Sequence, residues 1–123
     1  MLYTTPRSTE DALRWQQLRI GSAAWEGWPL KFQRMAFGYY EESGWLTAAE
    51  GLNWMREHDR LSLSTPPRGG LAWFESNDRV TVFCGVGDGR VIGPGVAGVV
   101  GLAVQTDLTG YRGWSPAVFP FAR

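Results

Sequence analysis

Hydrophobic side chains at helical spacing predict a first helix near the start of the chain. Ser8, with Asp11 three residues later, has the spacing of a capping box, in which side chains satisfy free backbone N–H groups at a helix start. The apolar positions that follow recur every three or four residues as far as Gly21. The pattern therefore predicts a helix over residues 9–20, with Ala12, Trp15 and Leu18 on one face.

A second helix is predicted to begin at Pro29. Proline suits the first helical position because its missing N–H would lack a partner there in any residue. Phe32 and Ala36 follow at helical spacing, and a glycine typically ends a helix. We therefore expect this helix to end near Gly38 or Gly44.

A third, shorter helix is predicted from Thr47 onward. Thr47 and Glu50 repeat the capping-box spacing, and Leu52 and Met55 supply an apolar stripe. His58 lies near the expected end, where a cationic side chain interacts favourably with the helix dipole. We interpret this histidine as structural.

The spacing changes beyond residue 67 to period two and to short continuous apolar runs, which are the patterns of β-strands. Asp88-Gly89 separates two of these runs, and both residue types tolerate the positive φ of a tight hairpin turn. Helices followed by strands predict an α+β fold, with the N-terminal helices packed on a small antiparallel sheet. The predicted strands are residues 71–74, 80–84, 90–92 and 99–104.

Composition narrows the classes of partner. The chain has 123 residues and a mass of 13.7 kDa, so we expect a single domain over residues 1–123. Its 12 Lys and Arg balance 12 Asp and Glu, so no overall field draws the chain to nucleic acid or to a membrane surface. The longest apolar stretch, residues 91–104, is interrupted by glycine and proline and is too short to span a bilayer. Because no signal-peptide pattern opens the sequence, the expected location is the cytoplasm.

The chain has one cysteine, Cys84, and one histidine, His58. This excludes an internal disulfide framework and a multi-cysteine zinc site, and we expect neither a metal nor a cofactor. Cys84 ends an apolar strand with no basic neighbour to lower its pKa, so we interpret it as a buried apolar residue. Residues 93–98 match the G-x-G-x-x-G pattern of dinucleotide sites. That pattern here contains a proline and precedes no helix, so we interpret it as a loop entering a strand.

Seven tryptophans are many for this length. Three lie in predicted helices or strands and are interpreted as core residues: Trp15, Trp54 and Trp73. Four lie in glycine-rich loops, where aromatic side chains commonly line sites for sugars or peptides. These four candidates for a ligand-contacting wall are Trp25, Trp28, Trp45 and Trp114.

Several runs of sequence together resemble a known family. They are residues 24–32 (AWEGWPLKF), 43–49 (SGWLTAA), 66–74 (PPRGGLAWF), 79–83 (RVTVF), 87–92 (GDGRVI) and 111–116 (YRGWSP). In order and in the spacing of aromatic residues and glycines, the chain from about residue 9 resembles the bacterial NlpC/P60 (CHAP-like) cell-wall peptidases. The resemblance implies a papain-like fold.

The resemblance also implies where a catalytic site would lie. In these peptidases a cysteine opens the central helix, a histidine opens the following strand, and a third polar residue orients the histidine. Matched by motif, those positions fall on Pro29, Arg79 and Gly93. None keeps the chemistry, because proline has no nucleophile, arginine stays protonated and glycine orients nothing. Strand alternation turns Cys84 away from Arg79, so we expect the cysteine-peptidase mechanism to be lost.

The leading hypothesis is therefore a pseudoenzyme. Its groove would bind a peptide-like, glycan or small anionic ligand, or a protein partner, without hydrolysis. Arg79 and the free N–H groups of the helix that starts at Pro29 would both favour an anion. The simpler alternative is that Arg79 forms a surface ion pair with Asp78 or Glu75. The candidate ligand-binding residues are Trp25, Glu26, Trp28, Trp45, Asp78, Arg79 and Trp114.

Two other functions stay open at this point. A repurposed enzyme that acts on a small metabolite would use Glu26, Asp78 or Tyr39 as acid or base and Arg79 as an electrostatic stabiliser. A structural or assembly subunit would use its exposed tryptophans as interface anchors. A fold alone does not decide among these functions.

Overall fold

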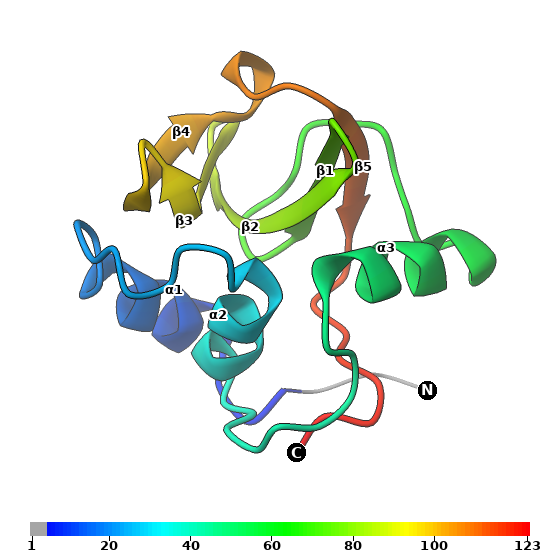
Figure 1. Ribbon diagram of the computed structural model, residues 1–123, viewed down its shortest axis with the longest axis horizontal. Helices are drawn as coiled ribbons and strands as arrows, with labels where there is room; N and C mark the ends of the chain where they lie inside the picture. The colour runs from blue at the N-terminus through cyan, green and yellow to red at the C-terminus, as the bar shows by residue number, and fades with distance from the viewer. Residues whose placement is uncertain (1–4) are drawn as a thin grey trace.

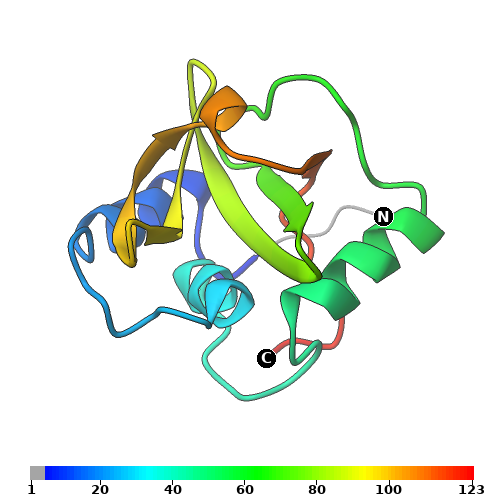
Figure 2. The ribbon, with the colours of Figure 1, turned by 45° about the horizontal axis from the view of Figure 1, so that its top comes forward.

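The computed structural model describes residues 5–123, as three helices followed by a five-stranded antiparallel sheet (Figure 1). The predicted α+β class is thus confirmed. The sheet order is β4-β3-β2-β1-β5, which places β2 at its centre (Figure 2). The elements are α1 (Thr9–Gln17), α2 (Pro29–Ala36), α3 (Ala48–Glu57), β1 (Leu71–Ser76), β2 (Arg79–Gly87), β3 (Arg90–Val96), β4 (Val99–Val104), the short 3-10 helix η1 (Gln105–Asp107) and β5 (Tyr111–Ser115).

The three helix starts lie where the sequence predicts them. The Ser8 hydroxyl accepts a hydrogen bond from the Asp11 backbone N–H at 3.1 Å, and the Thr47 hydroxyl accepts one from Glu50 N–H at 3.2 Å. Pro29 is the first residue of α2. Helix α1 ends at residue 17, earlier than the predicted residue 20. Helix α2 ends at residue 36, and Gly38, with a φ of +99°, directly follows its C-cap residue, which confirms the predicted end near Gly38.

The two faces of the sheet pack against different partners. The helices cover the face that carries Trp73, Val82 and Cys84, and together they form the larger hydrophobic core. The opposite face curls around a smaller cluster of Ala72, Phe74, Phe83 and Val91. Alternate residues of β2 therefore enter different cores, so Cys84 and Phe83 lie on opposite faces as predicted.

A buried pair of glutamines joins α1, α2 and the sheet. Gln16 Nε2 donates to Gln33 Oε1 at 2.9 Å, and Gln33 Nε2 donates back to Gln16 Oε1 at 3.1 Å. Gln33 Nε2 also lies 3.3 Å from the Ile92 carbonyl oxygen of β3. Both side chains are fully buried, so these bonds satisfy amide groups that would otherwise be costly to bury.

Two-residue turns join the first four strands. Asp88 and Gly89 have φ values of +56° and +77°, which confirms the predicted hairpin turn between β2 and β3. Two other turns of this kind were not predicted: residues 77–78 join β1 to β2 and residues 97–98 join β3 to β4. The G-x-G-x-x-G segment therefore belongs to strand β3 and a hairpin turn, and no helix follows it.

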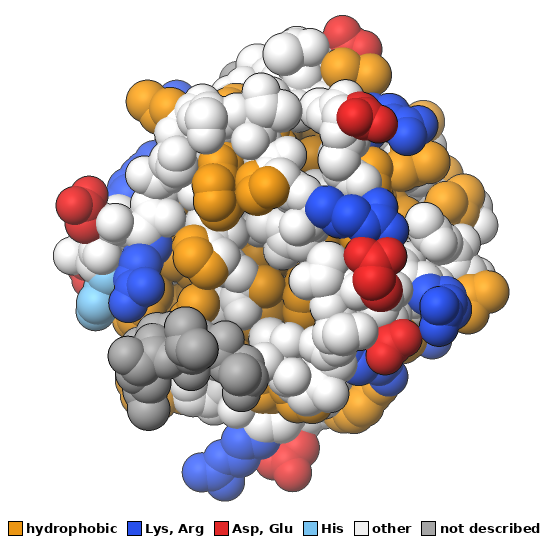
Figure 3. All heavy atoms as spheres, turned by 180° about the vertical axis from the view of Figure 1, so that it is seen from behind, with side chains coloured by type: hydrophobic (Ala, Val, Ile, Leu, Met, Phe, Trp, Pro, Cys, Tyr) orange, Lys and Arg blue, Asp and Glu red, His pale blue; other side chains and the backbone are white. Residues whose placement is uncertain are grey.

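Strand β5 is a further element that the sequence pattern did not predict. Its sequence, YRGWS, alternates poorly in hydrophobicity, yet it pairs with β1 and forms one edge of the sheet. On the face shown in Figure 3, acidic and basic side chains are interspersed. Within residues 5–123, no helix has the length and apolar character needed to cross a membrane.

Replacement of Gly89 by valine tests the hairpin. Gly89→Val should lower the free energy of unfolding by about 1–3 kcal/mol, because a β-branched residue is strained at positive φ. Crowding is not the reason, since a Cβ at this position would meet only the Thr65 side chain, at 3.9 Å. Gly89→Asn is the matched control, because asparagine tolerates this backbone conformation. Urea denaturation gives the unfolding midpoint of the wild-type protein and of both variants. An unchanged midpoint in the valine variant would contradict the turn assignment.

Candidate functional site

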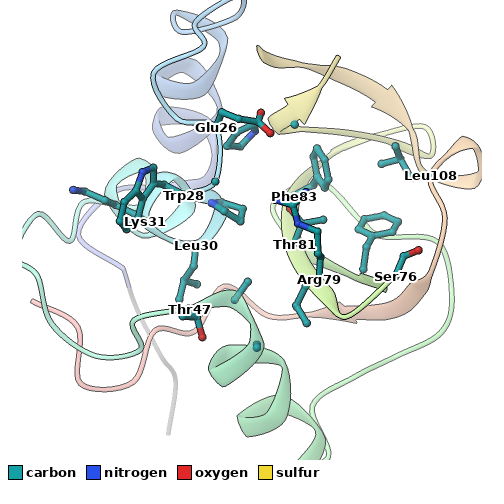
Figure 4. A pocket seen from close by; sticks show the side chains of 18 of the residues that line it. Glu26, Trp28, Leu30, Lys31, Thr47, Ser76, Arg79, Thr81, Phe83 and Leu108 are labelled. Carbon is teal, nitrogen blue, oxygen red and sulfur yellow. The ribbon is translucent and has the colours of Figure 1, made fainter. Parts of the chain in front are cut away.

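A cavity of about 510 Å³ lies between the helices and the curled sheet. Figure 4 shows Trp28, Leu30 and Lys31 on its helical side, and Arg79, Thr81 and Phe83 on its sheet side. The start of α3 closes one end, and the two residues after η1, Leu108 and Thr109, border another. The lining residues are Glu26, Gly27, Trp28, Pro29, Leu30, Lys31, Leu46, Thr47, Ala48, Ala49, Phe74, Ser76, Arg79, Val80, Thr81, Phe83, Pro94, Gly95, Leu108 and Thr109.

The N-terminus of α2 opens on this cavity. Trp28 is the N-cap residue, no side chain caps the helix, and its first turn contains no acidic residue. The backbone N–H groups of Leu30 and Lys31 have no acceptor within the helix, because they lie in its first turn. The helix dipole adds partial positive charge at the same end. This wall of the cavity is therefore complementary to a negative group.

Arg79 contributes a full positive charge from the sheet side. It is the first residue of β2, and its side chain is exposed and lines the cavity. Its side chain makes neither an ion pair nor a hydrogen bond with any other residue in 5–123. The alternative of a surface pair is not what the structure holds. Asp78 forms no ion pair with Arg79, and Glu75 pairs instead with Arg56 at 2.8 Å and with Arg112 at 3.3 Å. Arg79 is thus available to a ligand.

Lys31 is a second cation at the cavity, but it is already paired. Its ammonium lies 2.8 Å from a Glu42 carboxylate oxygen and 5.7 Å from the Trp28 ring centroid. The hydrogen bond from Lys31 lowers the pKa of Glu42. The buried Arg34 lies 3.7 Å from the other Glu42 oxygen and donates to the carbonyl oxygens of Tyr39 and Glu41. These bonds fix the α2–α3 loop, which brings residues 46 and 47 to the cavity wall.

The structure brings together only part of the site set that the sequence suggested. Glu26, Trp28 and Arg79 line the cavity, together with Pro29 at the position matched to the family's nucleophile. Gly93, matched to the third catalytic position, is buried outside the lining, where an added Cβ would lie 2.8 Å from the Phe83 ring.

The other loop tryptophans lie outside the cavity. Trp25 packs edge-on against Trp15, with ring centroids 5.6 Å apart, and lies partly buried against the larger hydrophobic core. Trp45 packs on Trp54 at 5.7 Å, beside α3. Trp114 lies on β5, where its indole N–H donates to a serine hydroxyl at 3.0 Å, and it borders a separate hollow of about 440 Å³. The expected wall of four loop tryptophans is therefore not formed. Trp25 and Trp45 pack against other tryptophans, and Trp114 lies on the edge strand β5.

Two candidate acid or base residues also lie elsewhere. Asp78 has a φ of +62° and occupies the hairpin turn before β2, so its main role is to permit the turn. Tyr39 packs on Phe119, with ring centroids 5.7 Å apart, against the main core. Glu26 is the one predicted acid that lines the cavity.

The sequence predicts only some of the apolar residues that line the cavity. The alternation of β2 indicated that Thr81 and Phe83 would share a face with Arg79, and both line the cavity. Phe74 and Leu108 were missed. Phe74 reaches the cavity through the antiparallel register of β1 with β2, and Leu108 through η1, and neither arrangement has a local sequence signal.

The single histidine and cysteine take no part in the described cavity lining. His58 stacks on Trp54, with ring centroids 3.9 Å apart, and its Nδ1–H donates to the Trp54 carbonyl at the end of α3. Cys84 is fully buried on the helix-covered face, and burial raises the pKa of its thiol to about 12. Residues 5–123 contain no group of three His, Cys, Asp or Glu side chains placed to hold a metal ion.

Comparison of the chain with known protein families, with curated proteins and with solved structures finds no match.

The burial of Cys84 makes a testable difference to its reactivity. Native protein at pH 8 should react slowly with a disulfide reagent such as dithiobis(nitrobenzoic acid), because the thiol is shielded and its pKa lies far above this pH. Denatured protein should react rapidly at its one cysteine. The release of the coloured thiol measures both rates. Fast labelling of the native state would show that Cys84 is open to solvent and would contradict its placement.

Proposed function

We propose that this chain is a domain of the NlpC/P60 type that has lost peptidase chemistry and binds a small peptide-like or other polar ligand by its anionic group. One observation carries the proposal. The uncapped helix N-terminus at Pro29 and the Arg79 side chain, which has no ion-pair partner, line the same cavity from opposite sides. In the family that the sequence resembles, these two positions hold the nucleophile and the base. A carboxylate or phosphate would gain hydrogen bonds and charge attraction from both walls.

The cavity is suited to a small ligand. Its volume of about 510 Å³ falls within the usual range for small-molecule sites, and its lining mixes apolar side chains with a few polar groups. Trp28 is the one predicted loop tryptophan at its border, with 57% of its surface exposed. A glycan site would be expected to present several aromatic faces to the sugar rings. With one exposed tryptophan at its border, the cavity favours a peptide-like or small anionic ligand.

Loss of Arg79 should weaken binding without loss of the fold. The test begins with a thermal-shift screen of small carboxylates, dipeptides, phosphates and their uncharged counterparts, because any ligand specific to the native state raises the melting temperature. For the anions that bind, titration calorimetry should show Arg79→Gln weakening affinity about 10- to 150-fold, the equivalent of roughly 1.5–3 kcal/mol for a charged hydrogen bond.

Arg90→Gln is the matched control. Arg90 is also an exposed arginine at the start of a strand, directly after a two-residue hairpin turn, but it lies outside the cavity lining. Its replacement should leave affinity unchanged. Binding that is insensitive to Arg79→Gln, or a preference for uncharged ligands, would contradict the proposal. Hydrolysis of peptidoglycan-derived peptides by the wild-type protein would contradict the loss of peptidase chemistry.

A further inference from the structure

Two side chains of opposite charge, Glu26 and Arg79, line the same cavity but form no ion pair with each other. Glu26, on the loop between α1 and α2, is the one carboxylate in the described lining, and Figure 4 shows its side chain reaching from the helical side toward the sheet. Like Arg79, it makes no hydrogen bond or ion pair through its side chain with any residue of 5–123. The two groups are therefore too far apart to pair with each other, although they share one cavity.

Lys31 is the third charged residue in the described lining, but its charge is already neutralised by a carboxylate. Lys31 is held by Glu42 at 2.8 Å, and that pair neutralises itself at the border of the cavity. The charges left for a ligand are one negative group from the helical side and one positive group from the sheet side. Such a site is complementary to a molecule that carries both an ammonium and an anionic group.

The wall of the sheet beside these charges is apolar. Phe74 and Phe83 pack edge to face with ring centroids 5.6 Å apart, and only 2% and 3% of their surfaces are exposed. Leu108, the residue that follows η1, packs against the same cluster. Because the two rings are already almost fully buried, a ligand side chain placed beside them would gain mainly from the removal of its own apolar surface from water.

We propose that the cavity binds a small zwitterion with an apolar side chain, such as a free amino acid. Its ammonium faces Glu26, its carboxylate faces Arg79, and its side chain lies against Phe74 and Phe83. This inference rests on the proposed function, because it uses the same cavity and the same arginine. It adds a requirement for positive charge on the ligand, which an anion-binding site alone does not have.

Three probes that differ by one charge test the inference by titration calorimetry: L-phenylalanine, N-acetyl-L-phenylalanine, which lacks the ammonium, and phenethylamine, which lacks the carboxylate. L-Phenylalanine should bind at least 10-fold more tightly than either of the others. Glu26→Gln should weaken L-phenylalanine about 10-fold and leave N-acetyl-L-phenylalanine unchanged. Arg79→Gln should weaken both carboxylates. Glu57→Gln is the matched control, because Glu57 is exposed at the end of α3 and lies outside the cavity.

The outcomes separate this inference from the proposed function. If N-acetyl-L-phenylalanine binds as tightly as L-phenylalanine and Arg79→Gln weakens both, the anion site stands and the zwitterion preference is wrong. The inference also fails if L-phenylalanine does not bind at millimolar concentration, or if Glu26→Gln leaves its affinity unchanged. If Arg79→Gln leaves the affinity of a bound carboxylate unchanged, the proposed function fails as well.

Discussion

The reciprocal amide pair of Gln16 and Gln33 is the constraint on which the cavity depends. Both amides are fully buried, so a shift of either helix would leave their donors and acceptors without partners and out of reach of water. The positions of α1 and α2 relative to each other are therefore closely fixed. The further bond from Gln33 to the Ile92 carbonyl ties the pair to β3. Gln33 lies one turn after Pro29, so the bonds that fix this turn also fix the direction in which the N-terminus of α2 points.

The opposite wall depends on the tight hairpins and the strong curl of the sheet. The turn at residues 77–78 sets the point at which β2 begins, and Arg79 follows it directly. From there, alternation turns Arg79, Thr81 and Phe83 toward the cavity and Val82 with Cys84 toward the helices. A shift of one residue in this register would put Cys84 on the cavity side and Arg79 on the helix side. The side chains that face the cavity are thus a consequence of hairpin geometry.

Local signals predicted much of the fold and less of the site. Capping residues marked two helix starts, Pro29 marked the third, and Asp88-Gly89 marked a hairpin, because each acts through its own backbone neighbours. Strand β5 was missed, since it is held by pairing with β1 and its sequence lacks alternation. The loop tryptophans were assigned to a ligand wall because sequence cannot show that Trp25 finds Trp15 and that Trp45 finds Trp54. Such contacts are set by tertiary packing, as is the freedom of Arg79 and Glu26 from protein partners.

The central claim is that a ligand anion lies between the start of α2 and Arg79. Nuclear magnetic resonance of ¹⁵N-labelled protein tests it directly, with N-acetyl-L-phenylalanine added stepwise. The account predicts that the largest chemical-shift changes fall on the backbone N–H groups of Leu30 and Lys31 and on the Arg79 Nε–H, and that they saturate together with one affinity. Changes centred on the hollow beside Trp114, or changes that leave these three signals in place, would contradict it.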